Sequence, residues 1–237
     1  IVVTNRCTRK NNVAHMGAAV YSDNVKHLIK INNKYIGNVA NELGGAVYIK
    51  TSSYVKQIMC IYQENSARSS GGALTLEEVK VSVLISSRFE NNKGNLGGGG
   101  IQGINLQRIT SINTTYKSNN STFGGGLNID TGTYVINIAS LFLNNKVAKD
   151  GGGMYCKNTQ FVANINTSFV SNFAQRSGSC LELLSVDVLH GIHSNFRINL
   201  CFLQQGTVSI SDFISIHVYQ CNFTRNQANN GGAVNVV

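Results

Sequence analysis

The sequence of 237 residues predicts an all-β fold, a right-handed parallel β-helix of about nine turns with 26–27 residues in each turn. An asparagine recurs along the chain at this interval: Asn12, Asn38, Asn65, Asn92, Asn119, Asn145, Asn172, Asn199 and Asn226. The residues between these asparagines alternate between apolar and polar types with a period of two, which indicates strands rather than helices. Repeats this short cannot bury an apolar face alone, so stacked copies must share one core.

Two apolar columns precede the asparagine in each repeat. The column ten residues before the asparagine is mostly aliphatic: Leu28, Val55, Ile109, Val135, Val162, Leu189 and Ile216, interrupted by Ser82. The column seven residues before it is isoleucine in seven copies: Ile31, Ile58, Ile85, Ile112, Ile138, Ile165 and Ile192.

The same alternation continues with a small residue five positions before the asparagine and an aromatic residue three positions before it. The aromatic residue stands three positions before the asparagine in eight copies, and Arg9 replaces it in the first: Tyr35, Tyr62, Phe89, Tyr116, Phe142, Phe169, Phe196 and Phe223. Because the isoleucine, the small residue and the aromatic residue are spaced by two, we expect all three to point into the core. Truncation of Ile138 or Phe142 to alanine is then expected to cost about 2–5 kcal/mol.

The recurring asparagine predicts a corner with a hydrogen-bonded ladder. Asparagine tolerates a positive φ better than most residues, and stacked amides can bond from turn to turn. The expected ladder comprises Asn38, Asn65, Asn92, Asn119, Asn145, Asn172, Asn199 and Asn226. A glycine-rich step follows each ladder residue, as in Gly71-Gly72-Ala73, and predicts a second tight corner before the next strand.

Composition sets the class of protein. A hydrophobic fraction of 42% and a net charge of +9 do not fit the low hydrophobicity and high charge of disordered chains. No apolar run reaches the length of a membrane-spanning helix, so we expect no transmembrane segment. Residues 1–237 are expected to form a single β-helix domain. The start at Ile1 lacks a leader pattern and the end lies inside an apolar alternation, so we expect a segment of a longer chain or filament.

The combination aromatic-x-x-Asn followed by Gly-Gly-Ala-aliphatic occurs at Tyr62–Asn65 with Gly71–Leu74 and at Phe223–Asn226 with Gly231–Val234. This motif resembles the repeats of chlamydial polymorphic outer-membrane proteins and of large surface proteins of ciliates and other microbes. The resemblance covers essentially the whole chain. It implies a β-solenoid at an extracellular or cell-surface location, with a role in adhesion or in a structural coat.

The six cysteines have no zinc-finger spacing, so no structural metal is expected. Cys7, Cys60 and Cys221 stand in the column that serine or threonine holds in other copies, which fits small buried thiols. Cys180 and Cys201 fall on adjacent turns near the glycine corner. A disulfide between these two is the alternative, since an oxidising compartment would permit it.

Three sequons are candidates for N-glycosylation: Asn113, Asn166 and Asn222. These asparagines flank inward positions, so we expect their side chains to project into solvent. Asn119 also begins a sequon, but as a ladder residue it is expected to turn inward. Chance occurrence in a chain rich in asparagine and threonine is the alternative.

The sequence identifies no catalytic residue. Polysaccharide-cleaving β-helices need carboxylates clustered on neighbouring turns. The best such pair is Asp187 with Asp212, and two solvated charges are the more ordinary interpretation. His190 and His217 stack on successive turns and could form a metal or proton site, although such a stack is more often incidental. No cofactor is expected.

Positive charge is concentrated in the first half of the chain. Lys30 and Lys56 stand eighteen residues after their ladder asparagines on adjacent turns, and could begin a patch for an acidic polysaccharide or an anionic cell surface. An ordinary solvated face is the alternative. No arginine-rich run with interleaved aromatics occurs, which argues against nucleic acid as a partner.

We therefore expect a non-catalytic extracellular or cell-surface protein with a structural or adhesive role. It shows no atypical polar caps, so its turns are expected to stack end to end into a fibril or stalk. The alternatives are a polysaccharide-active β-helix enzyme, either a lyase or a hydrolase, and a glycan-binding module without chemistry.

Overall fold

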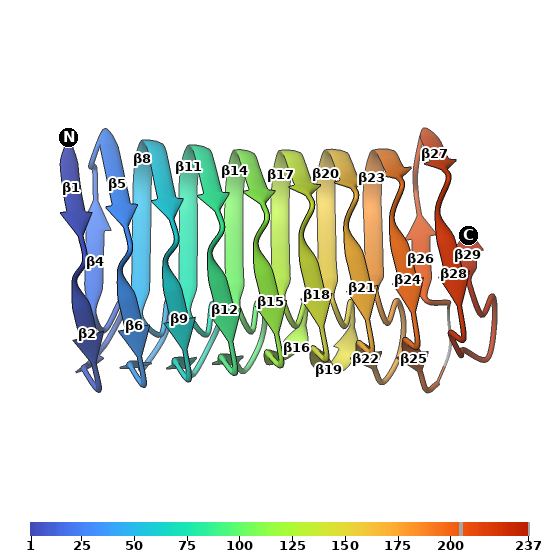
Figure 1. Ribbon diagram of the computed structural model, residues 1–237, viewed down its shortest axis with the longest axis horizontal. Helices are drawn as coiled ribbons and strands as arrows, with labels where there is room; N and C mark the ends of the chain where they lie inside the picture. Colours follow the sequence, from blue (N-terminus) through green and yellow to red (C-terminus); the bar gives the residue numbers. More distant parts are fainter. Residues whose placement is uncertain (204–205, 237) are drawn as a thin grey trace.

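The computed structural model describes residues 1–203 and 206–236, and it confirms the predicted β-solenoid of about nine turns (Figure 1). All strand pairs that the structure describes are parallel, and the strands form three sheets that run the length of the molecule. Within the described part of the chain there is no helix, and hence none that could cross a membrane.

The first sheet, here called the long sheet, comprises β1 (Val2–Asn5), β4 (Val20–Asp23), β5 (His27–Ile31), β8 (Val47–Ile58), β11 (Leu74–Ile85), β14 (Ile101–Ile112), β17 (Leu127–Ile138), β20 (Met154–Ile165), β23 (Leu181–Ile192), β26 (Val208–Ser211), β27 (Ser215–Tyr219) and β29 (Val234–Val236). The second, here called the aromatic sheet, comprises β2 (Thr8–Lys10), β6 (Lys34–Ile36), β9 (Ile61–Gln63), β12 (Arg88–Glu90), β15 (Thr115–Lys117), β18 (Leu141–Leu143), β21 (Ser168–Val170), β24 (Asn195–Arg197) and β28 (Asn222–Thr224).

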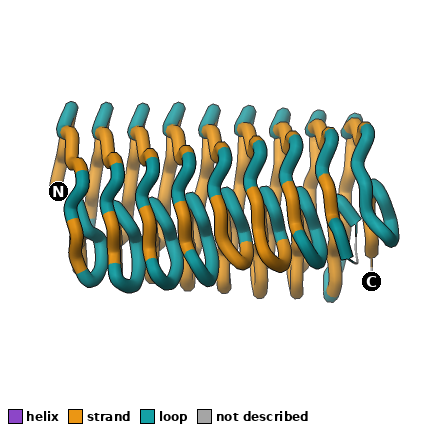
Figure 2. Tube along the Cα trace, turned by 90° about the horizontal axis from the view of Figure 1, so that it is seen from below, coloured by secondary structure: helices purple, strands orange, loops and turns teal. Residues whose placement is uncertain are grey.

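The third sheet, here called the corner sheet, comprises β3 (Val13–Ala14), β7 (Val39–Ala40), β10 (Ser66–Ala67), β13 (Lys93–Gly94), β16 (Asn120–Phe123), β19 (Lys146–Asp150), β22 (Phe173–Ala174) and β25 (Leu200–Cys201). Loops join its strands to the next long strand, and these loops stack along one side of the rod (Figure 2). The register places each residue beside its counterpart one repeat away, as Phe142 lies beside Phe169.

The aromatic column forms a continuous stack inside the solenoid. Neighbouring ring centroids lie 4.6–5.4 Å apart with interplanar angles of 3–16°, from Tyr35 to Phe223. The rings from Tyr35 to Phe196 are buried, as predicted, and Phe223 is half-buried. Stacking therefore follows from register, because the strand spacing matches the separation that aromatic pairs favour.

The asparagine ladder is also present. The Asn92 side-chain oxygen accepts hydrogen bonds from both the backbone N–H and the side-chain amide of Asn65, each at 3.0 Å. The Asn92 amide donates in turn to the Tyr62 carbonyl at 3.0 Å. The residue with a positive φ is the one before each ladder asparagine, such as Glu64, Asn91 and Ser118. The asparagine thus satisfies backbone groups at the corner without adopting the left-handed conformation itself.

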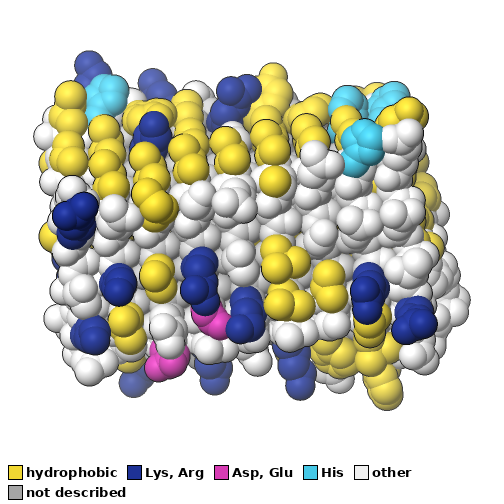
Figure 3. Space-filling model, viewed as in Figure 1, with side chains coloured by type: hydrophobic (Ala, Val, Ile, Leu, Met, Phe, Trp, Pro, Cys, Tyr) yellow, Lys and Arg dark blue, Asp and Glu magenta, His cyan; other side chains and the backbone are white. Residues whose placement is uncertain are grey.

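The isoleucine column does not lie in the core, which corrects the prediction. Ile31, Ile58, Ile85, Ile112, Ile138, Ile165 and Ile192 are half-buried on the outer face. The next residue in each copy has a φ of 48–52°, and this left-handed residue breaks the alternation of faces: Asn32, Met59, Ser86, Asn113, Ala139, Asn166, His193 and Gln220. Figure 3 shows rows of hydrophobic side chains over the upper part of this face.

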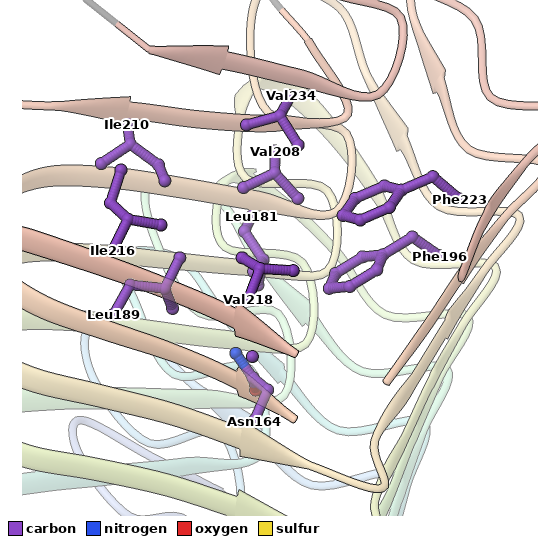
Figure 4. Close-up of a pocket in the computed structure, with 11 residues that line it drawn as sticks. Asn164, Leu181, Leu189, Phe196, Val208, Ile210, Ile216, Val218, Phe223 and Val234 are labelled. Carbon is purple, nitrogen blue, oxygen red and sulfur yellow. The ribbon is translucent and has the colours of Figure 1, made fainter. Parts of the chain in front are cut away.

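The column one residue earlier points inward instead, and it contains buried residues of mixed type: Lys30, Gln57, Leu84, Ser111, Asn137, Asn164 and Gly191. Gly191 leaves a cavity in the core near the C-terminal turns, between Asn164 and Val218 and beside Leu189, Phe196 and Phe223 (Figure 4). Apart from Asn164 the labelled side chains around this cavity are apolar. We interpret the cavity as a packing gap.

Replacement of Phe142 by alanine is expected to lower the free energy of unfolding by about 3–5 kcal/mol, because the buried ring loses both its burial and its two stacked neighbours. The Ile138→Ala variant should lose much less, since that side chain is half-buried. Urea unfolding of the two variants measures the difference, provided that the slope of the unfolding free energy against urea concentration is the same in both. Equal losses would contradict this register.

Candidate functional site

A groove on the outer side of the long sheet is the strongest candidate for a functional site. It lies beneath the loops of the glycine corner, and its lining comes from five successive turns: Leu43, Ser69, Ser70, Leu96, Gly97, Gln102, Ile104, Phe123, Asn128, Asp130, Tyr155 and Lys157. A left-handed residue in the middle of each long strand, such as Glu78 or Asn105, separates this groove from the face that carries the isoleucines.

The floor of the groove is one column of the long sheet. Gln102, Asn128, Tyr155 and Glu182 occupy equivalent positions on β14, β17, β20 and β23. The Asn128 amide donates a hydrogen bond to the Gln102 side-chain oxygen at 2.7 Å. Gly97 in the wall fits against this pair, because a Cβ atom there would lie 2.2 Å from the Asn128 nitrogen. The floor therefore presents amides first and then an aromatic ring.

Aromatic rings and charges form the sides of the groove. The Phe123 ring lies against Tyr155 with centroids 5.3 Å apart at an angle of 53°. The Lys149 ammonium lies 5.3 Å from the Phe123 centroid. Asp130 and Lys157 are neighbours in the next outward column and carry opposite charges. The groove therefore places apolar ring faces beside hydrogen-bonding groups, and the opposite charges of Asp130 and Lys157 offset each other.

Carboxylates cluster at the end of the floor. The buried Glu182 side chain accepts a hydrogen bond from the Ser177 hydroxyl at 2.6 Å. Burial, assisted by the negative charge of Asp150, raises the pKa of Glu182 to about 7, although bonds from Ser177 and Ser209 and the charge of Arg176 act in the opposite direction. Glu182 is therefore protonated in a large fraction of molecules at neutral pH.

Asp150 is held beside this glutamate by Arg176. The Arg176 guanidinium donates two hydrogen bonds to the Asp150 carboxylate, one of them from Nε at 2.8 Å and the other from Nη2. Asp150 is buried, and this forked pairing is the geometry that arginine favours with a carboxylate. The pairing raises the pKa of Arg176 further above its usual value, so the guanidinium stays charged.

Tyr155 links the carboxylates to the open groove. Burial and the negative charges of Asp150, Glu182 and Asp130 raise its pKa to about 12. Its hydroxyl therefore stays protonated and can donate a hydrogen bond. The three carboxyl groups and Tyr155 come from β17, β19, β20 and β23, so the stacking of turns brings together residues that are far apart in sequence.

The pair favoured by sequence does not form such a cluster. Asp187 is half-buried and Asp212 is exposed, and the register places Asp187 beside Ile214 rather than beside Asp212. Column counting missed Glu182 because it considered aspartates alone. The positions of Tyr155 and Glu182, each ten residues after its ladder asparagine, are the signal that would have found it.

The two histidines are adjacent, as expected. His190 and His217 pair in register, and their rings meet edge to face with centroids 4.9 Å apart. Among the described residues no group of three or more potential ligands could hold a metal ion.

The prediction that Lys30 and Lys56 begin a surface patch is wrong. Lys30 is fully buried and pairs with Gln57, whereas Lys56 is half-buried on the outer face and pairs with Ile29. The first repeat is one residue shorter between Ala14 and Val20, as the pairing of Ala14 with Ala40 and of Val20 with Val47 shows. A shift of one residue moves a side chain to the other face of a strand, so the two lysines point in different directions.

The structure does not join Cys180 to Cys201. Cys180 lies in the core next to the start of β23, and burial raises the pKa of its thiol well above the usual value. Cys201 belongs to the corner sheet, where its sulfur lies 3.0 Å from the Arg176 carbonyl oxygen. Cys180 precedes a strand of the long sheet whereas Cys201 lies in the corner sheet, so adjacency in the repeat count does not bring the sulfurs together.

The three sequon asparagines are exposed, as predicted: Asn113, Asn166 and Asn222. Asn119 is buried in the ladder, also as predicted. The exposure of these side chains leaves them accessible, while their glycosylation stays a prediction.

No protein-family model, curated protein or solved structure matches this chain. The geometry of the groove is therefore the main guide to its function.

The raised pKa of Glu182 predicts a dependence of stability on pH. Between the ordinary pKa of glutamate and about 7, the folded state binds a proton that the unfolded state has released, so stability falls as pH rises through this range. Over this range the wild type should lose about 3 kcal/mol of its free energy of unfolding, and Glu182→Gln should not show this loss. Urea unfolding at pH 4.5 and 7.5 measures this difference between the wild type and Glu182→Gln.

Glu90 offers a control of the opposite sign. Its pKa is lowered, chiefly by the hydrogen bond from Lys117, so its contribution is present above the unfolded pKa and is lost on acidification. Glu90→Gln should therefore change stability mainly at neutral pH and in the destabilising direction. An identical pH dependence in the wild type and Glu182→Gln would show that Glu182 titrates normally.

Proposed function

We propose that this chain is a non-catalytic structural solenoid of an extracellular or cell-surface protein, and that its outer groove adheres to neutral glycans. The observation that carries the proposal is the floor of the groove, where the Gln102 and Asn128 amides and the Tyr155 ring follow one another on successive turns. Exposed sequons and the resemblance of the repeats to microbial surface proteins support the location.

The chemistry of the groove suits a sugar. A pyranose presents apolar C–H faces and a rim of hydroxyl groups, so it needs ring faces to pack on and amide or carboxylate groups to bond. Tyr155 and Phe123 supply the rings, and Asn128, Asp130 and Lys157 supply polar groups at the edge. Sites for small molecules commonly combine an apolar lining with a few such polar groups.

The charge of the groove favours a neutral ligand. Asp130 lies beside Lys157, Asp150 is paired with Arg176, and the proton on Glu182 removes a further negative charge. No unbalanced cluster of either sign is therefore left on the described lining of the groove. An acidic polysaccharide would gain little from this surface compared with a neutral one.

The glycan proposal predicts a specific loss of binding. Cellohexaose, mannohexaose and chitohexaose, titrated into the protein by calorimetry, are expected to include at least one ligand. Tyr155→Ala should weaken that binding at least tenfold, because it removes the ring and the hydroxyl at the centre of the floor. The matched control is Tyr134→Ala, an exposed tyrosine beyond the bend of β17, which should bind as the wild type does. Equal losses in both variants, or no binding by any neutral oligosaccharide, would contradict the proposal.

A polysaccharide-active enzyme is the second candidate, and the pKa of Glu182 favours it. A carboxyl group that keeps its proton near neutral pH beside a second carboxylate resembles the acid of a glycosidase. Against this, Glu182 and Asp150 are both buried, and Asp150 is tied to Arg176. Chromatography of the same oligosaccharides after incubation separates the two candidates. Cleavage that disappears in Glu182→Gln would establish the enzyme, and intact oligosaccharides support adhesion.

End-to-end assembly is part of the same proposal. The terminal turns expose apolar side chains: Ile1 and Val3 at one end and Ile214, Val218 and Val236 at the other. An open strand edge with apolar neighbours recruits further strands. We propose that a second copy of this chain covers at least one end.

Light scattering tests the assembly. At rising concentration the mass of the isolated chain should increase above that of a monomer, because its apolar ends can stack. Introduction of a charge at one end, as in Val218→Lys, should reduce the association. A chain that stays monomeric at high concentration would contradict this part of the proposal.

A further inference from the structure

A second polar cavity lies inside the first turns of the solenoid, far along the rod from the carboxylate cluster. Strands β1, β4 and β5 and the residue Arg9 of β2 surround it. Its polar lining comprises Thr4, Arg9, Ser22, Asp23 and Lys30. This cavity differs from the groove in that Arg9, Ser22 and Lys30 occupy inward positions of the repeat. The next turn has Tyr35 and Ile49 at the positions of Arg9 and Ser22, whereas the column of Lys30 is of mixed type.

Lys30 is the centre of this cavity. Its side chain is fully buried, and its ammonium has no hydrogen-bond acceptor among the described protein atoms. The one ring contact of the ammonium is with Tyr35, at 5.4 Å from the ring centroid. A buried cation without a partner is costly, so its retention at an inward position requires a reason.

Two more donors lie beside it without acceptors. Arg9 occupies the position of the aromatic column, with its guanidinium 5.7 Å from the Tyr35 centroid, and its Nη1 atom is buried and has no acceptor among the described protein atoms. Ser22 occupies an inward position that Ile49 holds in the next turn, and its hydroxyl is likewise buried without a partner. The carboxylate in this lining, Asp23, is exposed, so it does not neutralise the interior.

We propose that this cavity binds a small oxyanion, a phosphate or a carboxylate group, between Arg9, Ser22 and Lys30. All three side chains are donors, and two of them are cations. An oxyanion has several acceptor positions close together and would supply partners for all three donors at once. Hydrogen bonds between charged partners are also the strong ones in proteins, and the planar guanidinium suits phosphate and carboxylate alike.

Proton linkage follows from the environment of Lys30. Burial, assisted by the positive charge of Arg9, lowers its pKa to about 7, whereas Cys60 acts in the opposite direction. Tyr35 and Cys7 also face this region, and Asp23 lies at its rim. A bound anion favours the charged ammonium and so raises the pKa of Lys30. Binding should therefore take up protons and strengthen as pH falls from 8 to 6.

Calorimetric titration of the chain with inorganic phosphate and with acetate tests the proposal at constant ionic strength, with chloride as the background anion. The wild type should bind at least one of the two, about tenfold more tightly at pH 6 than at pH 8. Phosphate and acetate serve as separate arms that identify which group the cavity accepts. Repeating the titration in buffers of different ionisation enthalpy measures the protons taken up.

Three variants locate the binding. Lys30→Leu copies the leucine that Leu84 supplies two turns later, and Arg9→Tyr copies the aromatic column. Each should weaken binding at least tenfold. Lys56→Leu is the matched control, because it removes a positive charge from the outer face of the neighbouring strand, and it should bind as the wild type does.

Two results would overturn the proposal. One is a wild-type chain that binds neither anion at 50 mM. This concentration is on the order of ten times the largest dissociation constant that a specific site implies. The other is binding that the three variants weaken equally, which would indicate a general effect of charge. If the inward variants fail to fold, the proton uptake of the wild type decides, because anion binding without uptake near pH 7 would exclude Lys30.

Discussion

The asparagine ladder is the interaction on which the rest of the structure depends. At each corner between the aromatic and corner sheets, the chain turns sharply and leaves backbone groups in a buried place. The ladder amides satisfy these groups by donating to the carbonyl of the aromatic residue in the preceding turn, as Asn119 does to Phe89 at 2.9 Å. This hydrogen bond fixes the position of each turn relative to the next along the axis of the solenoid. Aromatic stacking and the alignment of the groove floor then result from this fixed register.

The parts of the fold that repeat could be predicted from sequence, and the parts that depend on single irregular residues could not. The ladder, the aromatic column and the glycine corners recur in nearly all copies, so periodicity alone identifies them. The isoleucine column was misplaced because the left-handed residue after it varies widely in type. Met59, Ala139 and His193 are poor markers of a positive φ, and sequence offers no other signal for it.

The candidate sites show the same limit. Asp150 ends a strand of the corner sheet whereas Glu182 lies in the long sheet, so no single spacing relates them, and only the stacking of turns brings them together. Lys30 was placed on the surface because the first repeat lacks one residue before Val20. Exposure of Asn113, Asn166 and Asn222 was predicted correctly, although Asn113 and Asn166 are themselves left-handed residues that break the alternation on which the prediction rested. The groove itself arises from loops and strands of several turns and has no sequence signature.

The parallel register also makes the molecule modular. Every ladder bond and ring contact joins one turn to the next, so no position depends on a turn farther away. Insertion or deletion of a whole repeat would lengthen or shorten the rod by about 4.8 Å while leaving its cross-section unchanged. Gene duplication could therefore tune the reach of this protein in small steps, whereas the loss of a single residue, as in the first repeat, moves the next side chains of the strand onto the opposite face.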